Sequence, residues 1–323
     1  MANRKCLFCY ESLTEEPQEY HKRCCKKLYS TETVPEVDFR LDEIEKIAEN
    51  LVRARLAITG VQPKVSVELK KPARGQTTKP VLSRVTFTDL PGLWGRYILK
   101  PPHKDYPFMP EIEDLSMHLA EICKIKTAIH SLVRLKSGEL AYLTKRFDRI
   151  DDQKLPLEDT CQLTGLLTED KYHSSMEKAG KAIAEYSSNS GMDMISFLEI
   201  GAFSFLIGNA DMHLKNFSLL TDNNESVGLA PAYDLLATKL LTRKDNEEMA
   251  LPINGKKSQL KQHDFVQLGL TLDIPQKAIE NVLSKLKRKL PEMLVTIDKG
   301  FLPNTLKVEF KKLIETRAQI LFL

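Results

Sequence analysis

The sequence predicts an α+β protein of two lobes, the first built on a small mixed β-sheet and the second mostly helical. Short apolar segments with strand-like alternation dominate residues 57–147, whereas apolar positions at helical spacing dominate the rest. A length of 323 residues and a hydrophobic content of 42% suffice for two buried cores. We expect a first lobe over 41–150 and a second over 151–323, preceded by a Cys-rich segment and linker over 1–40.

The first lobe is expected to be mostly sheet. Residues 41–56 show helical spacing and lead into a turn at 59–64, and Pro110 opens a further helical segment at 111–125. Apolar alternation bounded by Gly, Pro and polar clusters marks the strands. They are expected at 65–69, 81–87, 96–99, 130–135 and 140–147, with 71–80 as a hairpin tip.

The second lobe is expected to be a set of helices around a polar loop that carries Asp211. Two short strands, at 217–220 and near 229, are expected to flank this loop. The helices are expected at 175–187, 193–208, 262–270, 275–296 and 304–322.

Charge and hydropathy narrow the classes of partner. Lys and Arg number 47 against 44 Asp and Glu, and they are spread along the chain, so the field alone does not predict nucleic-acid binding. We find no apolar run of the ~18 residues that span a membrane. The N-terminus turns to Cys and charge without a signal peptide, so we expect a cytoplasmic protein and no membrane partner.

The first 25 residues contain four of the six Cys. Cys6 and Cys9 form a Cys-x2-Cys pair, and His21 and Cys24 form a His-x2-Cys pair eleven residues later. Such a set offers four ligands for tetrahedral Zn²⁺, although Cys25 beside Cys24 leaves the fourth ligand ambiguous. The alternative is a tethered arm whose Cys residues are merely reduced.

Asp211, Asn216 and Asp234 form the most informative pattern, together with Lys100 at the end of an apolar strand. Phosphoryl transfer from ATP needs an Asp to orient the attacking hydroxyl, an Asn and a second Asp to hold Mg²⁺, and a Lys on the phosphates. The Asp-x4-Asn spacing is that of a kinase catalytic loop. The alternative is a polar surface loop in which the spacing arose by chance.

A helix acid is expected to pair with Lys100, as in kinases. Glu111, Glu113 and Asp114 lie in the first turns of the helix at 111–125. Spacing does not choose among them, and Glu113 is our preference. The alternative is a solvated acidic first turn that is favoured by the helix dipole.

The end of the last strand, Lys145 to Phe147, is expected to be the hinge that pairs with adenine. Phe147 could equally be a core residue, and Arg146 and Asp148 could equally form a structural ion pair. Upstream, a turn containing Thr59, Gly60, Gln62 and Lys64 could aim N–H groups and a cation at phosphate. That turn matches no Gly-rich phosphate motif, so an ordinary turn is favoured when the segment is considered alone.

Two residues of the catalytic segment, and one further acidic segment, have competing interpretations. Lys215 is placed to neutralise a transferring phosphoryl group, or is a solvent-exposed Lys. His213 could orient the loop or be a structural, hydrogen-bonded His. The segment from Leu157 to Leu163 is expected to open a helix with the acids Glu158 and Asp159 at its start, where we favour capping.

These segments together resemble the HipA family of serine/threonine protein kinases, the toxins of bacterial toxin–antitoxin systems. The resemblance covers residues ~50–320 and implies ATP- and Mg²⁺-dependent phosphorylation of Ser or Thr. It makes Asp211 the base, Asn216 and Asp234 the Mg²⁺ ligands, Lys100 the phosphate-binding Lys, 145–147 the hinge and 57–64 the phosphate loop. The segments that carry it are Thr59 to Lys64, Leu99 to Pro101, Lys145 to Arg149, Glu158 to Gln162, Gly208 to Phe217 and Pro231 to Asp234.

The chain departs from the full-length members of that family in two ways. They carry an additional N-terminal subdomain of roughly a hundred residues before the phosphate loop. The short HipT-like toxins receive that subdomain from a separate small protein, so such a partner is expected here. Relatives autophosphorylate the phosphate loop, but Ala57 stands where their Ser would be. Thr59 keeps a hydroxyl that could be phosphorylated instead.

The resemblance further implies a protein substrate linked to translation, such as an aminoacyl-tRNA synthetase, and an antitoxin partner. Because nothing in the chain looks like a helix-turn-helix, DNA contact is expected to be indirect. Two other functions compete. One is a small-molecule phosphotransferase with the same Asp-x4-Asn and Asp layout, and the other is a catalytically inactive kinase scaffold that serves as a binding protein.

Overall fold

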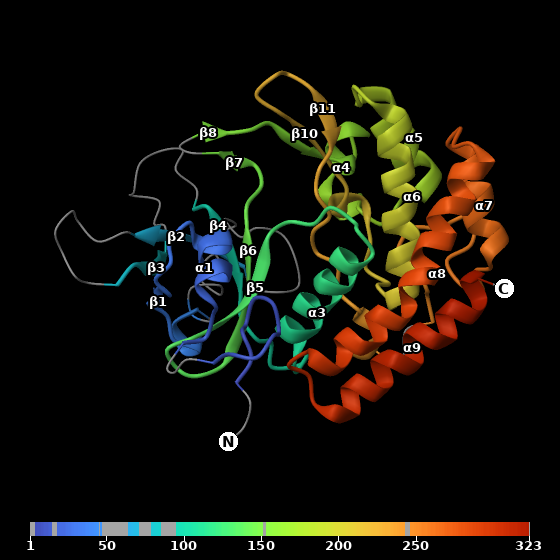
Figure 1. The fold of residues 1–323 in the computed structure, drawn as a ribbon. Coiled ribbons are helices and arrows are strands. Elements are labelled where there is room, and N and C mark those ends of the chain that lie inside the picture. The colour runs from blue at the N-terminus through green and yellow to red at the C-terminus, as the bar shows by residue number, and fades with distance from the viewer. Residues whose placement is uncertain are drawn as a thin grey trace. The chain divides into compact units, whose positions relative to one another are not determined.

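The computed structural model describes residues 4–14, 18–44, 46, 64–70, 79–84, 95–150, 153–242 and 246–322. The chain forms two compact units (Figure 1). The first unit comprises Met1–Asp114, Ala128–Asp152 and Lys299–Phe301. The second unit comprises Leu115–Thr127, Gln153–Asp298 and Leu302–Leu323.

The first unit is built on a six-stranded mixed sheet of order β1-β3-β2-β4-β6-β5. Its neighbouring strands are antiparallel except for β1 and β3, which are parallel. The five strands expected from alternation are confirmed, although 85–87 of the second lie outside the described residues. The strands are β1 (Glu36–Val37), β2 (Val65–Lys70), β3 (Val81–Arg84), β4 (Tyr97–Lys100), β5 (His130–Arg134) and β6 (Leu140–Lys145), and β7 (Arg149–Ile150) follows them.

The N-terminal segment is part of the core of the first unit. It contains helix α1 (Lys22–Tyr29), whose Cys24, Cys25, Leu28 and Tyr29 are buried. These side chains belong to one apolar cluster with strand residues such as Val67 and Leu143. The Leu7 carbonyl also accepts hydrogen bonds from Leu132 N at 3.3 Å and Ser131 Oγ at 3.0 Å. Burial of this face against the sheet stabilises a segment too short to build a core alone.

The stretch that we expected to be a linker, 31–40, instead contributes the edge strand β1. Glu36 and Val37 pair with Val81 and Leu82, and Lys136 N donates to the Phe39 carbonyl at 2.9 Å. Of the helix expected at 41–56, residues 41–44 are helical and 47–56 lie outside the described residues. The hairpin tip at 71–78 lies outside them as well.

Helix α3 (Met109–Ile122) confirms the helix expected at 111–125, with Pro110 in its first turn. Its residues up to Asp114 belong to the first unit and the rest to the second. Proline fits there because the first N–H groups of a helix have no intrahelical acceptor.

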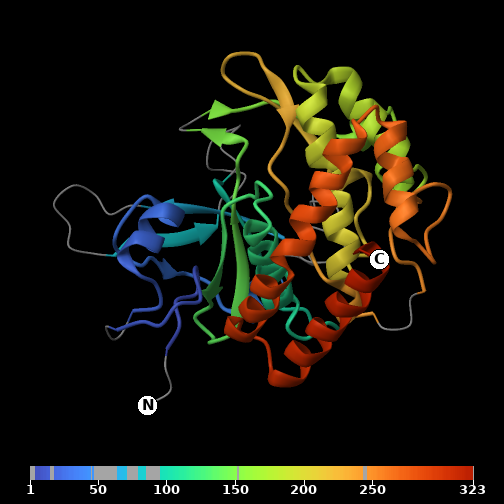
Figure 2. The same cartoon turned by 45° about the vertical axis from the view of Figure 1, so that its right-hand side comes forward.

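The second unit gathers its helices around α6 (Ser190–Ile207), which packs against α5 (Met176–Tyr186), α7 (Gln262–Thr271) and α9 (Asn304–Phe322) (Figure 2). All five expected helices are confirmed, and so are the two strands, to which the structure adds a third, β9. The sheet has the order β11-β10-β9. The elements are β8 (Gln153–Lys154), β9 (Leu157–Asp159), α4 (Thr160–Leu163), η1 (Thr168–Asp170), α5 (Met176–Tyr186), α6, η2 (Leu214–Asn216), β10 (Ser218–Thr221), β11 (Val227–Leu229), η3 (Thr238–Leu240), α7 (Gln262–Thr271), α8 (Gln276–Lys299) and α9 (Asn304–Phe322).

Helix α6 corrects one expectation from the sequence. We expected no apolar run of membrane-spanning length, yet these 18 residues have a mean hydropathy of 1.4 and meet that length and composition. Two thirds of the segment, 67%, is buried inside the protein. A helix that is apolar on all sides and packed by neighbours is typical of the core of a folded unit.

Candidate active site

Lys100 and Glu113 form a buried ion pair in the first unit. Lys100 is the last residue of β4 and Glu113 lies in the first half of α3, and Nζ stands 2.5 Å from Oε1. The side chains are 5% and 1% exposed. The ring of Tyr142, the neighbour of Lys100 on β6, lies 5.4 Å from Nζ and adds a cation–π contact.

The other two acids in the first turns of this helix have different surroundings, which explains the pairing. Asp114 accepts hydrogen bonds from Tyr10 Oη at 2.6 Å and from His130 Nδ1 at 2.7 Å. Glu111 is half-buried, and burial raises the pKa of its carboxyl to about 7. The structure therefore confirms that Glu113 is the partner of Lys100, while the contact of either residue with a nucleotide stays a prediction.

The loop that carries Asp211 is held by backbone hydrogen bonds in the second unit. Gly208 ends α6 with φ +74°, a left-handed conformation that favours glycine. Asp211 N donates to Asn209 Oδ1 at 3.2 Å, and Ala210 N donates to Thr238 Oγ1 at 2.8 Å. The Asp211 carbonyl accepts from His213 N at 2.9 Å. The sequence folds into this turn because short polar side chains replace the helical acceptors.

The Asp211 carboxylate is exposed and accepts a hydrogen bond from Tyr172 Oη at 2.7 Å. Burial, and next the bond to Asp211, raise the pKa of Tyr172, so the phenol stays protonated as a donor. The His213 ring stands edge-on to Tyr172, with centroids 5.2 Å apart. Burial lowers the pKa of His213, which keeps the imidazole neutral. Sequence reasoning missed Tyr172, since no motif connects it to a residue 39 positions away.

Asn216 and Asp234, the expected Mg²⁺ ligands, lie in the same unit as Asp211. Asn216 is buried and donates from Nδ2 to the Asp211 carbonyl at 3.2 Å, so its Oδ1 is the amide atom left for a cation. Asp234 has φ +54°, a left-handed conformation that is uncommon without glycine. An amide oxygen and carboxylates are the donors that Mg²⁺ prefers, so these residues fit the ion.

Lys215 is held by an acid that the sequence did not assign to it. Its Nζ lies 2.5 Å from Asp159 Oδ2. Asp159 also caps α4, since Oδ1 accepts from Gln162 N at 3.0 Å and Gln162 Oε1 accepts from Asp159 N at 2.9 Å. The predicted capping role is confirmed, and the action of Lys215 on a phosphoryl group stays a prediction.

The expected hinge follows β6 in the first unit. Burial lowers the pKa of Lys145, with Arg96 adding to the effect, and Phe147 is half-buried. Asp148 is buried and accepts from Arg146 Nε at 3.0 Å and from Arg149 Nη1 at 2.6 Å. The structural ion pair of Arg146 and Asp148 is thus confirmed, whereas contact of this segment with adenine stays a prediction.

The expected phosphate loop is mostly beyond what the structure describes. Thr59, Gly60 and Gln62 lie outside the described residues, as does Ala57. Lys64 is described, half-buried, immediately before β2.

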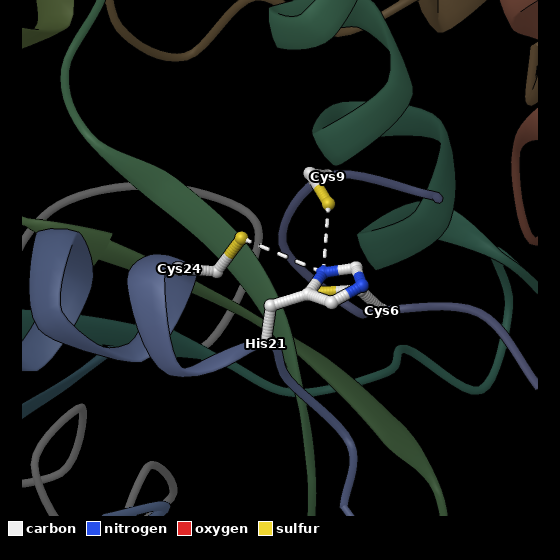
Figure 3. Close-up of side chains that lie close together, drawn as sticks. All are labelled: Cys6, Cys9, His21 and Cys24. Atoms are coloured by element: carbon white, nitrogen blue, oxygen red, sulfur yellow. Dashed lines mark hydrogen bonds between the residues drawn. The ribbon is translucent and has the colours of Figure 1, made fainter. Parts of the chain in front are cut away.

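Four side chains of the N-terminal segment come together as the sequence predicted. The ligand atoms of Cys6, Cys9, His21 and Cys24 all lie within 4.8 Å of one another (Figure 3). Cys25 is buried and is not a member of the group. The hydrogen bond between the two thiols lowers the pKa of Cys6 and raises that of Cys9 to about 12.

A pocket of about 290 Å³ in the second unit does not include the predicted catalytic residues. It therefore gives no support to a nucleotide site. Its lining residues are Pro156, Glu158, Gln162, Leu163, Tyr186, Leu219, Thr221 and Val227.

Comparison with known proteins gives matches over most of the chain. A family model described as the HipA-like C-terminal domain matches residues 56–294. A Sinorhizobium fredii protein named "Putative kinase Y4dM" is 29% identical over 252 residues, which are 74% of this chain and 59% of that protein. A Haemophilus influenzae protein named "Putative kinase" is 26% identical over 289 residues, 80% of this chain and 78% of its own. The chain thus matches little more than half the length of the first of these relatives.

Two solved structures are similar in fold. HipA of Shewanella oneidensis MR-1, in a complex with HipB and operator DNA, has a TM-score of 0.67 and 18% identity, covering 87% of this chain and 70% of its own. The Helicobacter pylori proinflammatory kinase CtkA has a TM-score of 0.54 and 16% identity, covering 74% of this chain and 90% of its own. At such identities the likeness shows the fold alone, and it confirms the predicted two-lobed, kinase-like α+β class.

Proposed function

The chain belongs to the family of HipA-like C-terminal domains, and from this premise we propose that it is an ATP- and Mg²⁺-dependent serine/threonine protein kinase. Relatives named as kinases support the phosphotransferase part of this proposal. The restriction to Ser and Thr rests on the family resemblance.

The observation that carries the proposal is the buried pair of Lys100 and Glu113. Burying two charges costs several kcal/mol per ion, and apolar residues of the same volume would serve stability as well or better. A kinase has a separate reason for this arrangement, because its strand Lys must be held by a helix Glu to bind ATP phosphates. The first unit would therefore supply the phosphate contacts.

The second unit would supply the base and the metal ligands. Asp211 would orient and accept the proton of the attacking hydroxyl, since its carboxylate is exposed and is aimed by Tyr172. Asn216 Oδ1 and the Asp234 carboxylate would hold Mg²⁺, and the ion when bound neutralises phosphate charge. Lys215, which forms an ion pair with Asp159, would add positive charge near the transferring phosphoryl group.

The substrate and partners follow from the family. The similar Shewanella HipA was solved with HipB and operator DNA, which supports an antitoxin partner for this chain, with DNA reached through that partner. The proposed role is a toxin of the cytoplasm that phosphorylates a translation-related protein, such as an aminoacyl-tRNA synthetase. A separate small protein would supply the N-terminal subdomain of full-length HipA.

Radiolabelled ATP added to a bacterial lysate with the purified chain tests the activity. We expect labelled protein bands carrying phosphoserine or phosphothreonine, and their loss in Asp234→Asn. Label found only in soluble small molecules would replace the proposal by a small-molecule phosphotransferase. If the wild-type chain transfers no phosphate, even with the partner encoded beside it added, the proposal is replaced by a catalytically inactive kinase scaffold.

Autophosphorylation of Thr59 is a second part of the proposal, resting on its hydroxyl in the expected phosphate loop. Incubation with Mg-ATP followed by mass spectrometry should find phosphate on Thr59 and none in Thr59→Ala. Ser66, the next hydroxyl residue along the chain, provides the control, because Ser66→Ala should leave the phosphate on Thr59 unchanged. Phosphate at other positions but never at Thr59 would refute this part.

A further inference from the structure

The cluster of Cys6, Cys9, His21 and Cys24 has the dimensions of a metal site. His21 Nδ1 lies 3.4 Å from Cys9 Sγ and 3.9 Å from Cys24 Sγ. In a tetrahedron with Zn–S of about 2.3 Å and Zn–N of about 2.0 Å, nitrogen and sulfur stand about 3.5 Å apart and two sulfurs about 3.8 Å apart. The four ligand atoms, all within 4.8 Å of one another, therefore surround a space of the right size for one ion.

His21 is oriented as a metal ligand. Its Nε2 lies 3.1 Å from the Ser12 carbonyl, which can only accept a hydrogen bond, so Nε2 carries the proton. In the neutral ring the lone pair is then on Nδ1, the atom that faces the two sulfurs (Figure 3). A backbone carbonyl that fixes the tautomer in this way is the usual second contact of a metal-binding His.

The backbone brings the two halves of the cluster together from separate elements. Cys6 and Cys9 lie in a turn closed by Cys6 N to the Glu11 carbonyl at 2.9 Å and Tyr10 N to the Cys6 carbonyl at 3.0 Å. His21 is the N-cap of α1, and Cys24 lies in its first turn.

We propose that Cys6, Cys9, His21 and Cys24 bind one structural Zn²⁺ ion. Three thiolates and one imidazole form a closed tetrahedral set that leaves no position for substrate, so the ion acts on structure rather than chemistry. Cys24 rather than Cys25 is the fourth ligand, because only Cys24 belongs to the cluster. The ion itself takes no part in the proposed phosphoryl transfer.

The ion would stabilise a contact that reaches α3. Tyr10 directly follows Cys9, has φ +63°, and donates its hydroxyl to Asp114 at 2.6 Å. Asp114 is the neighbour of Glu113, the partner of Lys100. A metal that holds the Cys6–Cys9 turn therefore also holds the tyrosine that fixes the start of this helix.

Metal analysis of the full-length chain tests the site. The chain is purified, exposed to Zn²⁺ alone, separated from free metal and measured by mass spectrometry for metals; we expect about one zinc per chain. Cys9→Ala and Cys24→Ala should each lose most of it, and the matched control Cys25→Ala should retain it. Replacement by Co²⁺ should give the visible bands of a tetrahedral ion and the near-ultraviolet absorption of thiolate ligands.

The wild-type chain alone decides the question if the variants do not fold. Wild-type protein with less than about a tenth of a zinc per chain after this treatment, or Co²⁺ spectra of an octahedral ion, would overturn the proposal. Loss of zinc in Cys25→Ala with retention in Cys24→Ala would overturn the ligand set. None of these measurements uses ATP, so a failed kinase assay leaves them unaffected.

Discussion

The candidate catalytic residues of the first unit and those of the second have opposite surroundings. Lys100 and Glu113 are sealed in the first unit, with 5% and 1% of their side chains exposed. Asp211 in the second unit is exposed, and its carboxylate accepts from Tyr172 Oη. The buried charges are stabilised by each other instead of by water, whereas the exposed carboxylate remains hydrated. A change in the pair should therefore alter stability and activity together, and a change in Asp211 should alter activity alone.

The largest expected effect is the loss of activity in Asp211→Asn. Removing a general base lowers the rate by about 10²- to 10⁴-fold, while loss of an exposed charge changes the free energy of unfolding by about 0.5 kcal/mol or less. Phosphate transfer to lysate proteins and thermal melting measure the two effects. Asp105→Asn, which changes an exposed loop acid of the first unit, is the control. If Asp211→Asn lowers the melting temperature as well as the activity, Asp211 contributes to stability too, and the two regions do not differ in this respect.

The next effect concerns stability, through Lys100→Met and Glu113→Gln. Each leaves a charge buried without its counter-ion and should cost about 3 to 5 kcal/mol in the free energy of unfolding. The double variant Lys100→Met with Glu113→Leu should cost much less than the sum, because no charge remains buried. Urea denaturation measures all three. Lys70→Met, at the exposed end of β2, should be nearly neutral, and a neutral Lys100→Met would show that the pair is not sealed.

A smaller effect depends on pH and on Glu111. Its pKa, raised to about 7 by burial, exceeds the ordinary value of 4.5, so the folded state binds more protons between these two pH values. Stability therefore falls as pH rises from about 4.5 to about 7, and the loss is complete above that. Glu111→Gln should remove this fall and stabilise the chain at pH 8 by about 1 to 2 kcal/mol, since solvent reduces the full shift at a half-exposed group.

Urea denaturation at pH 5 and pH 8 measures the Glu111 effect, with Glu280→Gln on α8 as the control. Equal stabilisation by Glu111→Gln at both pH values would contradict a raised pKa.

The smallest effect is expected from Tyr172→Phe. A net hydrogen bond contributes about 1 kcal/mol, so loss of the contact with Asp211 should lower the rate about fivefold with little change in melting temperature. Tyr186→Phe on α5 removes a hydroxyl from an exposed tyrosine and should leave the rate unchanged. Kinetic assays of both variants sharpen the comparison, because an unaffected Tyr172→Phe would mean that the exposed carboxylate needs no hydrogen-bond donor.

Local pattern was enough to predict most of the elements and to nominate the residues of the candidate site. Strands β2 and β4 to β6 and the helices of the second unit follow from alternation and helical spacing, which depend on near neighbours. The choice of Glu113 as the partner of Lys100 agreed with the structure, but local sequence did not contain the reason why Asp114 is not the partner. Asp114 is held by Tyr10, which is 104 residues away in sequence, and by His130.

The features that sequence missed arise from contacts between distant segments. Strand β1 has two residues and exists through pairing with β3, and β9 through pairing with β10. The pairing of Lys215 with Asp159 and of Tyr172 with Asp211 likewise joins residues that no motif connects. Helix α1 was not predicted, although its buried residues Cys24, Cys25 and Leu28 share one face. The Cys spacing in this segment was interpreted only as a metal-binding pattern.

The left-handed backbone of Asp234 lowers the stability of the folded chain, while its carboxylate is the proposed ligand of Mg²⁺. Glycine would relieve a conformational cost of about 1 kcal/mol at this position, yet it would remove the carboxylate. If Asp234 holds Mg²⁺ as proposed, replacement by glycine should stabilise the chain and abolish phosphoryl transfer. Among relatives of this chain, the residue at this one position should tell active members from those that have kept only the scaffold.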